Sequence, residues 1–181
     1  GVIALTPKPF EDLLGLVGPI AMPQHGMTLT ANNFQDAVQY KTSVDYDRRQ
    51  NEPKKFLADF APLLLNRLVD LKREQWFELF RIFQDNLKSK QVLLYSKDKA
   101  SQEKIGQAGF GGEILPADKD YLAIVNSNLG GTKTDLEMIQ TAELTTKILS
   151  DGSVVNNLRL QRSNTTTERN RSYLRILVPR G

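Results

Sequence analysis

The chain has 181 residues, of which 40% are apolar, and this is enough to bury one sizeable core. Its 24 lysine and arginine residues exceed its 21 acidic residues by three, so the charge indicates only a weak preference for anions. The absence of cysteine excludes a disulfide framework, a thiol nucleophile and a cysteine-bound zinc ion.

The first two thirds of the chain predict strands that alternate with helices. Short apolar runs predict buried strands at residues 2–5, 19–22 and 91–96. Helical spacing and end signals, including Thr6 and Thr30 as N-caps, predict helices at residues 6–18, 29–40, 53–71, 73–89 and 98–109. This order of strands and helices is typical of the α/β class.

Two of these helices carry wide apolar stripes. The first stripe consists of Phe56, Phe60, Leu63, Leu64, Leu68 and Val69, and the second of Trp76, Phe80, Phe83 and Leu87. A helix laid on a sheet needs an apolar stripe of at least about 100°, so both stripes are predicted to be core. Pro62 removes one backbone donor and predicts a kink in the first of these helices.

The last third predicts strands only. A buried strand is expected at residues 121–128, and two extended segments, 136–150 and 154–163, flank a hairpin turn at Asp151 and Gly152. Alternating apolar residues predict a last strand at 172–179. We therefore expect a single α/β domain over residues 1–181, with a mixed β-sheet flanked by helices and a C-terminal antiparallel meander or hairpin. It is helix-rich over residues 1–118 and β-rich over residues 119–181.

The stretch "SVDYDRRQN" is the first candidate binding site. An arginine fork at Arg48 and Arg49 can hold two phosphate oxygens, and a carboxylate such as Asp45 can bring a divalent cation or orient the guanidinium. The alternative is a solvated connector, in which neighbouring acids and bases neutralise each other for less than about 1 kcal/mol.

A second polar cluster follows the strand at residues 121–128. Asn126, Asn128, Lys133 and Asp135 surround a turn at Gly130 and Gly131. Polar groups at the end of a sheet strand are where ligands of α/β proteins usually bind. The alternative is a turn in which the asparagines hydrogen-bond their own backbone.

Three other features favour structural interpretations. The only histidine, His25, is predicted to be an exposed loop residue, and the glycines of "GQAGFGG" follow a helix, as a C-cap does. Five arginines lie near the C-terminus: Arg159, Arg162, Arg169, Arg171 and Arg175. They are predicted to be a solvated surface, because no nucleic-acid motif or interleaved aromatic accompanies them.

The order of these segments resembles a bacterial family known as domain of unknown function 4012. The segments that carry the resemblance are "GVIALTPKPFEDLLGLVGPI", "LTANNFQDAVQY", "PKKFLADFAPLLLNRL", "LKSKQVLLYSKD", "DYLAIVNSNLGGTKTD" and "NRSYLRILVPRG". The resemblance covers essentially the whole chain. It implies the C-terminal portion of a longer membrane-anchored protein whose bulk lies outside the cytoplasm, in the bacterial cell envelope.

The first part of the chain is more distantly similar to the LytR-CpsA-Psr envelope enzymes, which transfer glycan from a polyprenyl-pyrophosphate carrier to peptidoglycan. Asp45 and Arg48 match half of that family's Asp-x-x-Arg-x-x-Arg-Gln motif, and Asn51 and Glu52 stand in place of its second half. Lys41 stands where the family has an arginine. The resemblance implies a partial pyrophosphate site formed by Asp45, Arg48, Arg49 and Lys41.

These resemblances lead to three alternative functions. The first is an envelope domain that binds cell-wall glycan or its polyprenyl-pyrophosphate-linked form. The second is an active phosphotransferase, with Asp45 aiding Mg²⁺ binding and with Arg48 and Arg49 on the pyrophosphate; Mg²⁺ is the only cofactor that either resemblance implies. The third is a structural or protein-interaction module that uses a free strand edge at residues 173–178. Nucleic acid is not an expected partner.

Overall fold

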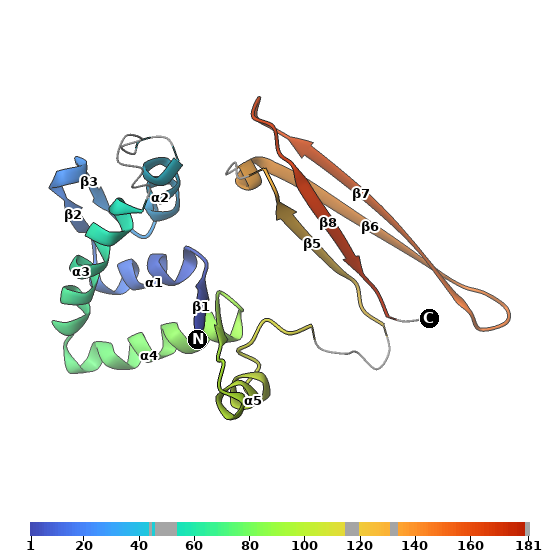
Figure 1. Cartoon of the computed structure of the whole chain (residues 1–181), viewed down its shortest axis with the longest axis horizontal. Coiled ribbons are helices and arrows are strands. Elements are labelled where there is room, and N and C mark those ends of the chain that lie inside the picture. The colour runs from blue at the N-terminus through green and yellow to red at the C-terminus, as the bar shows by residue number, and fades with distance from the viewer. Residues whose placement is uncertain (44, 46–53, 115–119, 131–133, 180–181) are drawn as a thin grey trace. The chain divides into compact units, whose positions relative to one another are not determined.

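The computed structural model describes residues 1–43, 45, 54–114, 120–130 and 134–179. The chain forms two compact units, Gly1–Leu115 and Pro116–Gly181. The described part of the first unit contains five α-helices and short strands, and that of the second contains long strands (Figure 1). The α/β class is therefore confirmed, whereas the single-domain organisation stays a prediction.

The described residues of the first unit form helices and two small antiparallel sheets. Its elements are β1 (Val2–Leu5), α1 (Lys8–Val17), β2 (Ile20–Met22), η1 (Pro23–His25), β3 (Met27–Leu29), α2 (Phe34–Ser43), α3 (Lys55–Val69), α4 (Arg73–Lys88), β4 (Val92–Tyr95) and α5 (Lys99–Gln107). Strand β1 pairs with β4, and β2 pairs with β3. The ladder between β1 and β4 joins the two ends of this helical segment, with Val2 opposite Tyr95.

The hydrophobic core of this unit is centred on a cluster of aromatic rings. The ring centroid of Phe34 lies 5.3 Å from that of Phe10 and 5.2 Å from that of Phe60. Leu14, Met22 and Leu29 are fully buried in the same cluster as Phe34 and Phe60. Rings at such distances add about 0.5–1.5 kcal/mol per pair beyond the burial of their area. The core thus joins α1, α2 and α3 to the small sheet of β2 and β3.

Helix α1 also packs along α4 (Figure 1). Helix α1 buries Leu13 and Leu14, and α4 buries Leu79 and Asn86. Because residues 79, 82 and 86 lie one and two helical turns apart, they share one face of α4. This pairing of helices positions the candidate site described below.

Helix α4 ends in a tight C-terminal turn. Lys90 has a φ of 62°, in the left-handed region that favours glycine. Its backbone N–H donates to the Leu87 carbonyl, and that of Gln91 donates to the Asn86 carbonyl. This pair of hydrogen bonds defines the Schellman motif, in which the left-handed residue is usually glycine. The turn leads the chain directly from α4 into β4.

The predicted core stripe of α4 is wrong. Trp76 is 52% exposed, Phe80 69% and Phe83 47%, while the residues that pack on α1 belong to the neighbouring face. Phe77, outside the predicted stripe, is 81% exposed. The helical period in the sequence reveals an apolar stripe, but it does not reveal whether another element covers it.

Other predictions of burial and capping also need correction. Strand β1 is exposed rather than buried, and Val69, predicted to be core, is exposed on α3. Thr6 does not cap α1: its hydroxyl donates to Gln91 Oε1 at 2.6 Å, and the helix begins at Lys8 without a side-chain cap. Thr30 does not cap α2, because that helix begins at Phe34.

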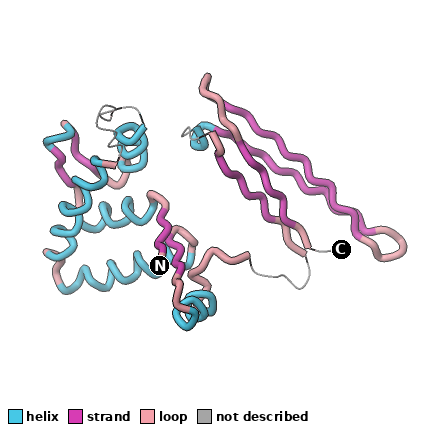
Figure 2. Tube along the Cα trace, viewed as in Figure 1, coloured by secondary structure: helices cyan, strands magenta, loops and turns pink. Residues whose placement is uncertain are grey.

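The described part of the second unit contains two antiparallel strand pairs (Figure 2). Its elements are β5 (Ala123–Asn128), η2 (Thr134–Glu137), β6 (Met138–Ile148), β7 (Val154–Asn164) and β8 (Ser172–Leu177). The predicted hairpin at Asp151 and Gly152 is confirmed, since β6 pairs with β7 and Gly152 has a φ of 83°. Strand β8 pairs with β5. Strand β5, predicted to be buried, is only half-buried.

Candidate functional site

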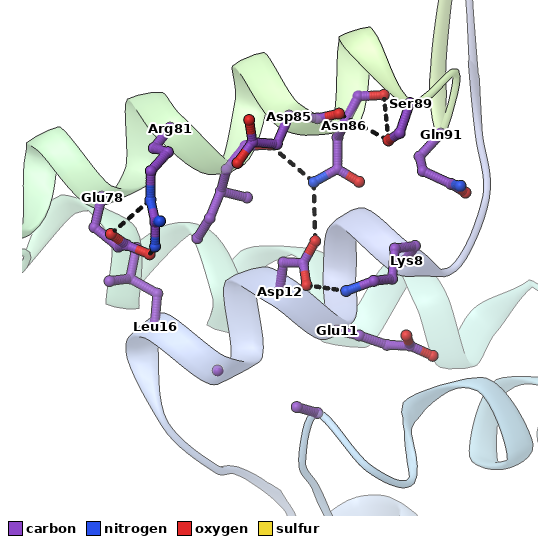
Figure 3. Close-up of a pocket in the computed structure, with 13 residues that line it drawn as sticks. Lys8, Glu11, Asp12, Leu16, Glu78, Arg81, Asp85, Asn86, Ser89 and Gln91 are labelled. Carbon is purple, nitrogen blue, oxygen red and sulfur yellow. Dashed lines mark hydrogen bonds and ion pairs between the residues drawn. The ribbon is translucent and has the colours of Figure 1, made fainter.

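An open cleft of about 780 Å³ lies between α1 and α4 in the first unit (Figure 3). It is lined by Lys8, Glu11, Asp12, Gly15, Leu16, Ala31, Glu78, Arg81, Ile82, Asp85, Asn86, Ser89 and Gln91. The cleft is large enough for a small ligand, because ligand pockets in proteins commonly measure about 300–1,000 Å³. Most of its lining residues carry polar or charged side chains.

Asp12 is the centre of a hydrogen-bonded group in this cleft. Asn86 Nδ2 donates to Asp12 Oδ2 at 3.0 Å, and Lys8 Nζ pairs with Asp12 Oδ1 from the preceding turn of α1 (Figure 3). Asn86 Nδ2 also donates to the Ile82 carbonyl at 2.8 Å. Asn86 is only 3% exposed, so its amide holds the Asp12 carboxylate in one orientation.

These contacts set the charge state of Asp12. Partial burial acts to raise the pKa of Asp12, but the hydrogen bonds from Lys8 and Asn86 and the charge of Lys8 outweigh it. The pKa of Asp12 is therefore lower than its ordinary value. Because donors favour the ionised form of a carboxyl group, Asp12 is a charged acceptor at neutral pH.

A second ion pair borders the cleft on α4. Arg81 Nε donates to Glu78 Oε2 at 3.1 Å, and Arg81 Nη2 donates to Glu78 Oε1 at 2.5 Å (Figure 3). The hydrogen bonds that Arg81 donates to Glu78, together with the negative charge of Glu78, raise the pKa of Arg81 above its ordinary value. This two-point contact presents a planar guanidinium at the edge of the cleft.

The lining has an excess of negative charge. Four acids, Glu11, Asp12, Glu78 and Asp85, stand against two bases, Lys8 and Arg81. The side chains of Leu16 and Ile82 supply apolar surface beside these polar groups. Such a lining offers hydrogen-bond donors and acceptors to a polar ligand, and its net charge favours a neutral or cationic one over an anion.

The structure describes only part of the predicted pyrophosphate site, which stays a prediction. Lys41 Nζ lies 2.6 Å from Asp45 Oδ2, so these two residues form an ion pair at the end of α2. The Asp45 side chain is exposed. Arg48 and Arg49 lie outside the described residues. Of the two interpretations, the contact between Lys41 and Asp45 fits mutual neutralisation at the surface.

The second predicted cluster lies in the other unit, where its members bond different partners. Asn126 Nδ2 donates to Gln140 Oε1 at 3.1 Å, and Asp135 Oδ1 accepts from Asn170 Nδ2 at 3.0 Å. Asn128 Oδ1 accepts from the Gly130 backbone N–H at 2.9 Å, as in the predicted turn interpretation. Lys133 lies outside the described residues.

His25 is not the exposed loop residue that was predicted. Its Nε2 lies 2.8 Å from Asp59 Oδ2, its ring packs on Phe56 with centroids 4.9 Å apart, and its side chain is only 17% exposed. The pair ties η1 to α3. Its contacts with Asp59 and the core residue Phe56 indicate a structural role.

Sequence reasoning missed the cleft between α1 and α4. Asp12 and Asn86 are far apart in the chain, so no local spacing brings them together. One signal was present: Asn86 lies at helical spacing from Leu79 and Ile82, on the face that α4 packs against α1. A polar side chain on a packed helix face indicates a buried hydrogen-bond partner.

Comparisons with known proteins assign neither a family nor a function to the chain. No family model, no curated protein and no solved structure matches the chain. The two family resemblances therefore stay predictions. Within the described residues, no group of three or more acidic, histidine or cysteine side chains could hold a metal ion, and no helix is long and apolar enough to cross a membrane.

Proposed function

We propose that the cleft between α1 and α4 binds a neutral or amino-sugar chain. The observation that carries this proposal is the hydrogen-bonded group of Asn86, Asp12 and Lys8, which presents oriented donors and acceptors in an open cleft. Sugar hydroxyls both donate and accept hydrogen bonds, so they can use the Asp12 carboxylate and the Lys8 ammonium together, while the buried Asn86 amide holds the carboxylate in place. The apolar surface of Leu16 and Ile82 can contact the carbon-bound faces of a sugar ring.

The charge of the cleft distinguishes between the two glycan ligands that the resemblances imply. A polyprenyl-pyrophosphate carries negative charge, and four acids against two bases in the cleft would repel it. A glycan without the phosphate meets no such penalty. The proposal is therefore limited to the sugar chain.

The cellular setting of this proposal comes from the family resemblances alone. They imply an anchored protein on the outer face of a bacterial membrane, where cell-wall glycan is the abundant sugar polymer. The phosphotransferase alternative depends on Asp45 with Arg48 and Arg49, and both arginines lie outside the described residues. All the lining residues of the α1–α4 cleft, in contrast, belong to the described part of the chain.

Titration calorimetry and amide NMR with defined sugars test the proposal. The probes are a tetramer of N-acetylglucosamine, its deacetylated form and inorganic pyrophosphate. We expect binding of one or both sugars, with amide shifts concentrated in α1 and α4, and no binding of pyrophosphate in the cleft. The exposed acid Asp85 lines the cleft, so Asp85→Asn is expected to weaken binding of the amino sugar.

A matched control removes the same charge elsewhere. Asp70, an exposed residue at the end of α3, does not line the cleft, so Asp70→Asn is expected to leave binding unchanged. Pyrophosphate binding with shifts confined to residues 40–55 would instead favour the phosphotransferase alternative. If neither sugar shifts any amide of α1 or α4, the cleft does not serve this function.

A further inference from the structure

Four aromatic side chains of α4 form an exposed surface, which we call the aromatic face. It consists of Trp76, Phe77, Phe80 and Phe83. Helical spacing places Trp76, Phe80 and Phe83 on successive turns of one side of the helix. The neighbouring side, with Leu79 and Asn86, is the one that packs on α1. The aromatic face is therefore fixed in place by a packed helix.

The aromatic face is large enough to act as an interaction surface. The four residues are between 47% and 81% exposed. Since an aromatic side chain has about 150–250 Å² of surface to bury, the face exposes roughly 500 Å². The largest apolar patch of a typical monomer is about 300–600 Å² and is often functional.

Basic residues border both ends of the aromatic face. Lys72 and Arg73 precede Trp76, Lys88 follows Phe83, and all three bases are exposed. The three acids of α4 lie on another side of the helix: Glu78 and Asp85 line the cleft (Figure 3), and Glu74 lies one turn before Glu78 on the same side. The face thus combines aromatic side chains with positive charge at its two ends.

A second copy of the chain is a poor occupant for this face. Two such faces would bury roughly 1,000 Å² of aromatic surface, whereas stable specific interfaces bury about 1,200–2,000 Å². An antiparallel pair of α4 helices centred on Phe80 would also place Lys72 against Lys88 of the second copy. Like charges would then meet at both ends of the pair, which opposes self-association.

We propose that the aromatic face of α4 docks on the surface of a membrane that contains anionic lipid. Helices that lie in the membrane interface combine aromatic and apolar residues on one side with lysine and arginine beside them. Tryptophan is enriched at this depth because its ring is amphipathic. An anionic surface neutralises the bases at both ends of the face, which a second copy cannot do.

The single tryptophan of the chain reports directly on this surface. Trp76 is the only tryptophan, and it lies in the aromatic face. Vesicles of equal parts phosphatidylglycerol and phosphatidylcholine, in low salt, are expected to shift the Trp76 emission to shorter wavelength and to co-sediment with the protein. Vesicles of phosphatidylcholine alone are expected to bind much more weakly, and added salt is expected to reverse the binding.

Two variants and one matched control sharpen the test. Phe77→Glu with Phe80→Glu replaces two exposed side chains and is expected to abolish the emission shift without lowering the urea midpoint. Replacing Lys72 and Arg73 with glutamine is expected to reduce partitioning by about thirtyfold, because each base near an anionic surface contributes about 1 kcal/mol to membrane binding. Replacing Lys99 and Lys104 of α5 removes the same charge elsewhere and is expected to change partitioning little.

Three results would overturn the proposal. The first is the absence of an emission shift with anionic vesicles. The second is unchanged partitioning of the Phe77→Glu, Phe80→Glu protein. The third is an emission shift that grows with protein concentration in the absence of vesicles, together with a doubled mass in sedimentation, which would show that a second copy covers the face.

Discussion

At the scale of single residues, Asn86 and Asp12 link stability to the candidate site. The buried Asn86 amide donates to the Asp12 carboxylate and to the Ile82 carbonyl. A buried donor that loses its acceptor typically costs about 1–3 kcal/mol, so this pair constrains how α1 and α4 pack. The same contact orients the carboxylate toward any ligand in the cleft.

The lowered pKa of Asp12 predicts a pH dependence. Because Lys8 and Asn86 stabilise the ionised form in the folded state, Asp12 adds stability at pH values above its unfolded pKa of about 4. That contribution disappears as the pH falls through the lower, folded-state pKa. The urea midpoint of the native protein should exceed that of Asp12→Asn at pH 7, and the difference should shrink toward pH 3. A difference that stays constant over this range would contradict the assignment.

At the scale of elements, the turn after α4 sets the direction of β4. Lys90 takes a left-handed conformation that costs an ordinary residue about 1–2 kcal/mol. Its Nζ compensates in part by donating to the Gly109 carbonyl beyond α5. One residue therefore terminates α4 and connects it to the end of α5.

Substitutions at Lys90 separate these two effects. Lys90→Gly relieves the backbone strain and loses the contact with Gly109, whereas Lys90→Ala keeps the strain and loses the same contact. We expect Lys90→Gly to be more stable than Lys90→Ala by about 1 kcal/mol in urea unfolding. Equal stability of the two variants would show that the turn is not strained at this position.

The elements also show which structural features could be predicted from the periodicity and turn residues of the sequence. The hairpin of β6 and β7 was predictable, because Asp151 and Gly152 specify a local turn. The exposure of Trp76 and Phe80 was not predictable. The helical spacing of apolar residues shows that they share one side of the helix, but it does not show whether another element covers that side. The predicted burial of strand β1 was wrong for the same reason: four apolar residues predict a strand, but they do not show whether another element packs on it.

At the scale of the whole molecule, the two units differ in how much apolar surface they bury. The hydrophobic core cluster lies entirely in the first unit. In the described part of the second unit, Thr134 is buried, but no apolar side chain is. The first unit therefore has its own core, whereas the second depends mainly on its backbone hydrogen bonds and half-buried side chains.

Separate expression of the first unit tests this difference. Residues 1–114 contain the whole core cluster and the β1–β4 ladder, so we expect this fragment to fold alone. Dispersed amide NMR signals and a cooperative urea transition would confirm it. A fragment without a cooperative transition would show that the core of the first unit is insufficient by itself.

The candidate site could be predicted less well than the fold, because it depends on how distant parts of the chain pack together. Most elements follow from local spacing and turn residues. The cleft instead depends on the packing of α1 against α4, which brings Asp12 to Asn86. The predicted sites were contiguous stretches of sequence, and the structure gave their described residues local or separate partners.

The ladder between β1 and β4 also governs the order of events during synthesis. Val2 cannot meet Tyr95 until almost the whole first unit has left the ribosome, whereas β6 and β7 can pair as soon as their short turn is made. Until then the apolar strand with Val2, Ile3 and Leu5 has no partner strand in this ladder. This apolar segment is thus a natural binding site for chaperones during translation, and we expect the closing of this ladder to be a slow, long-range step of folding.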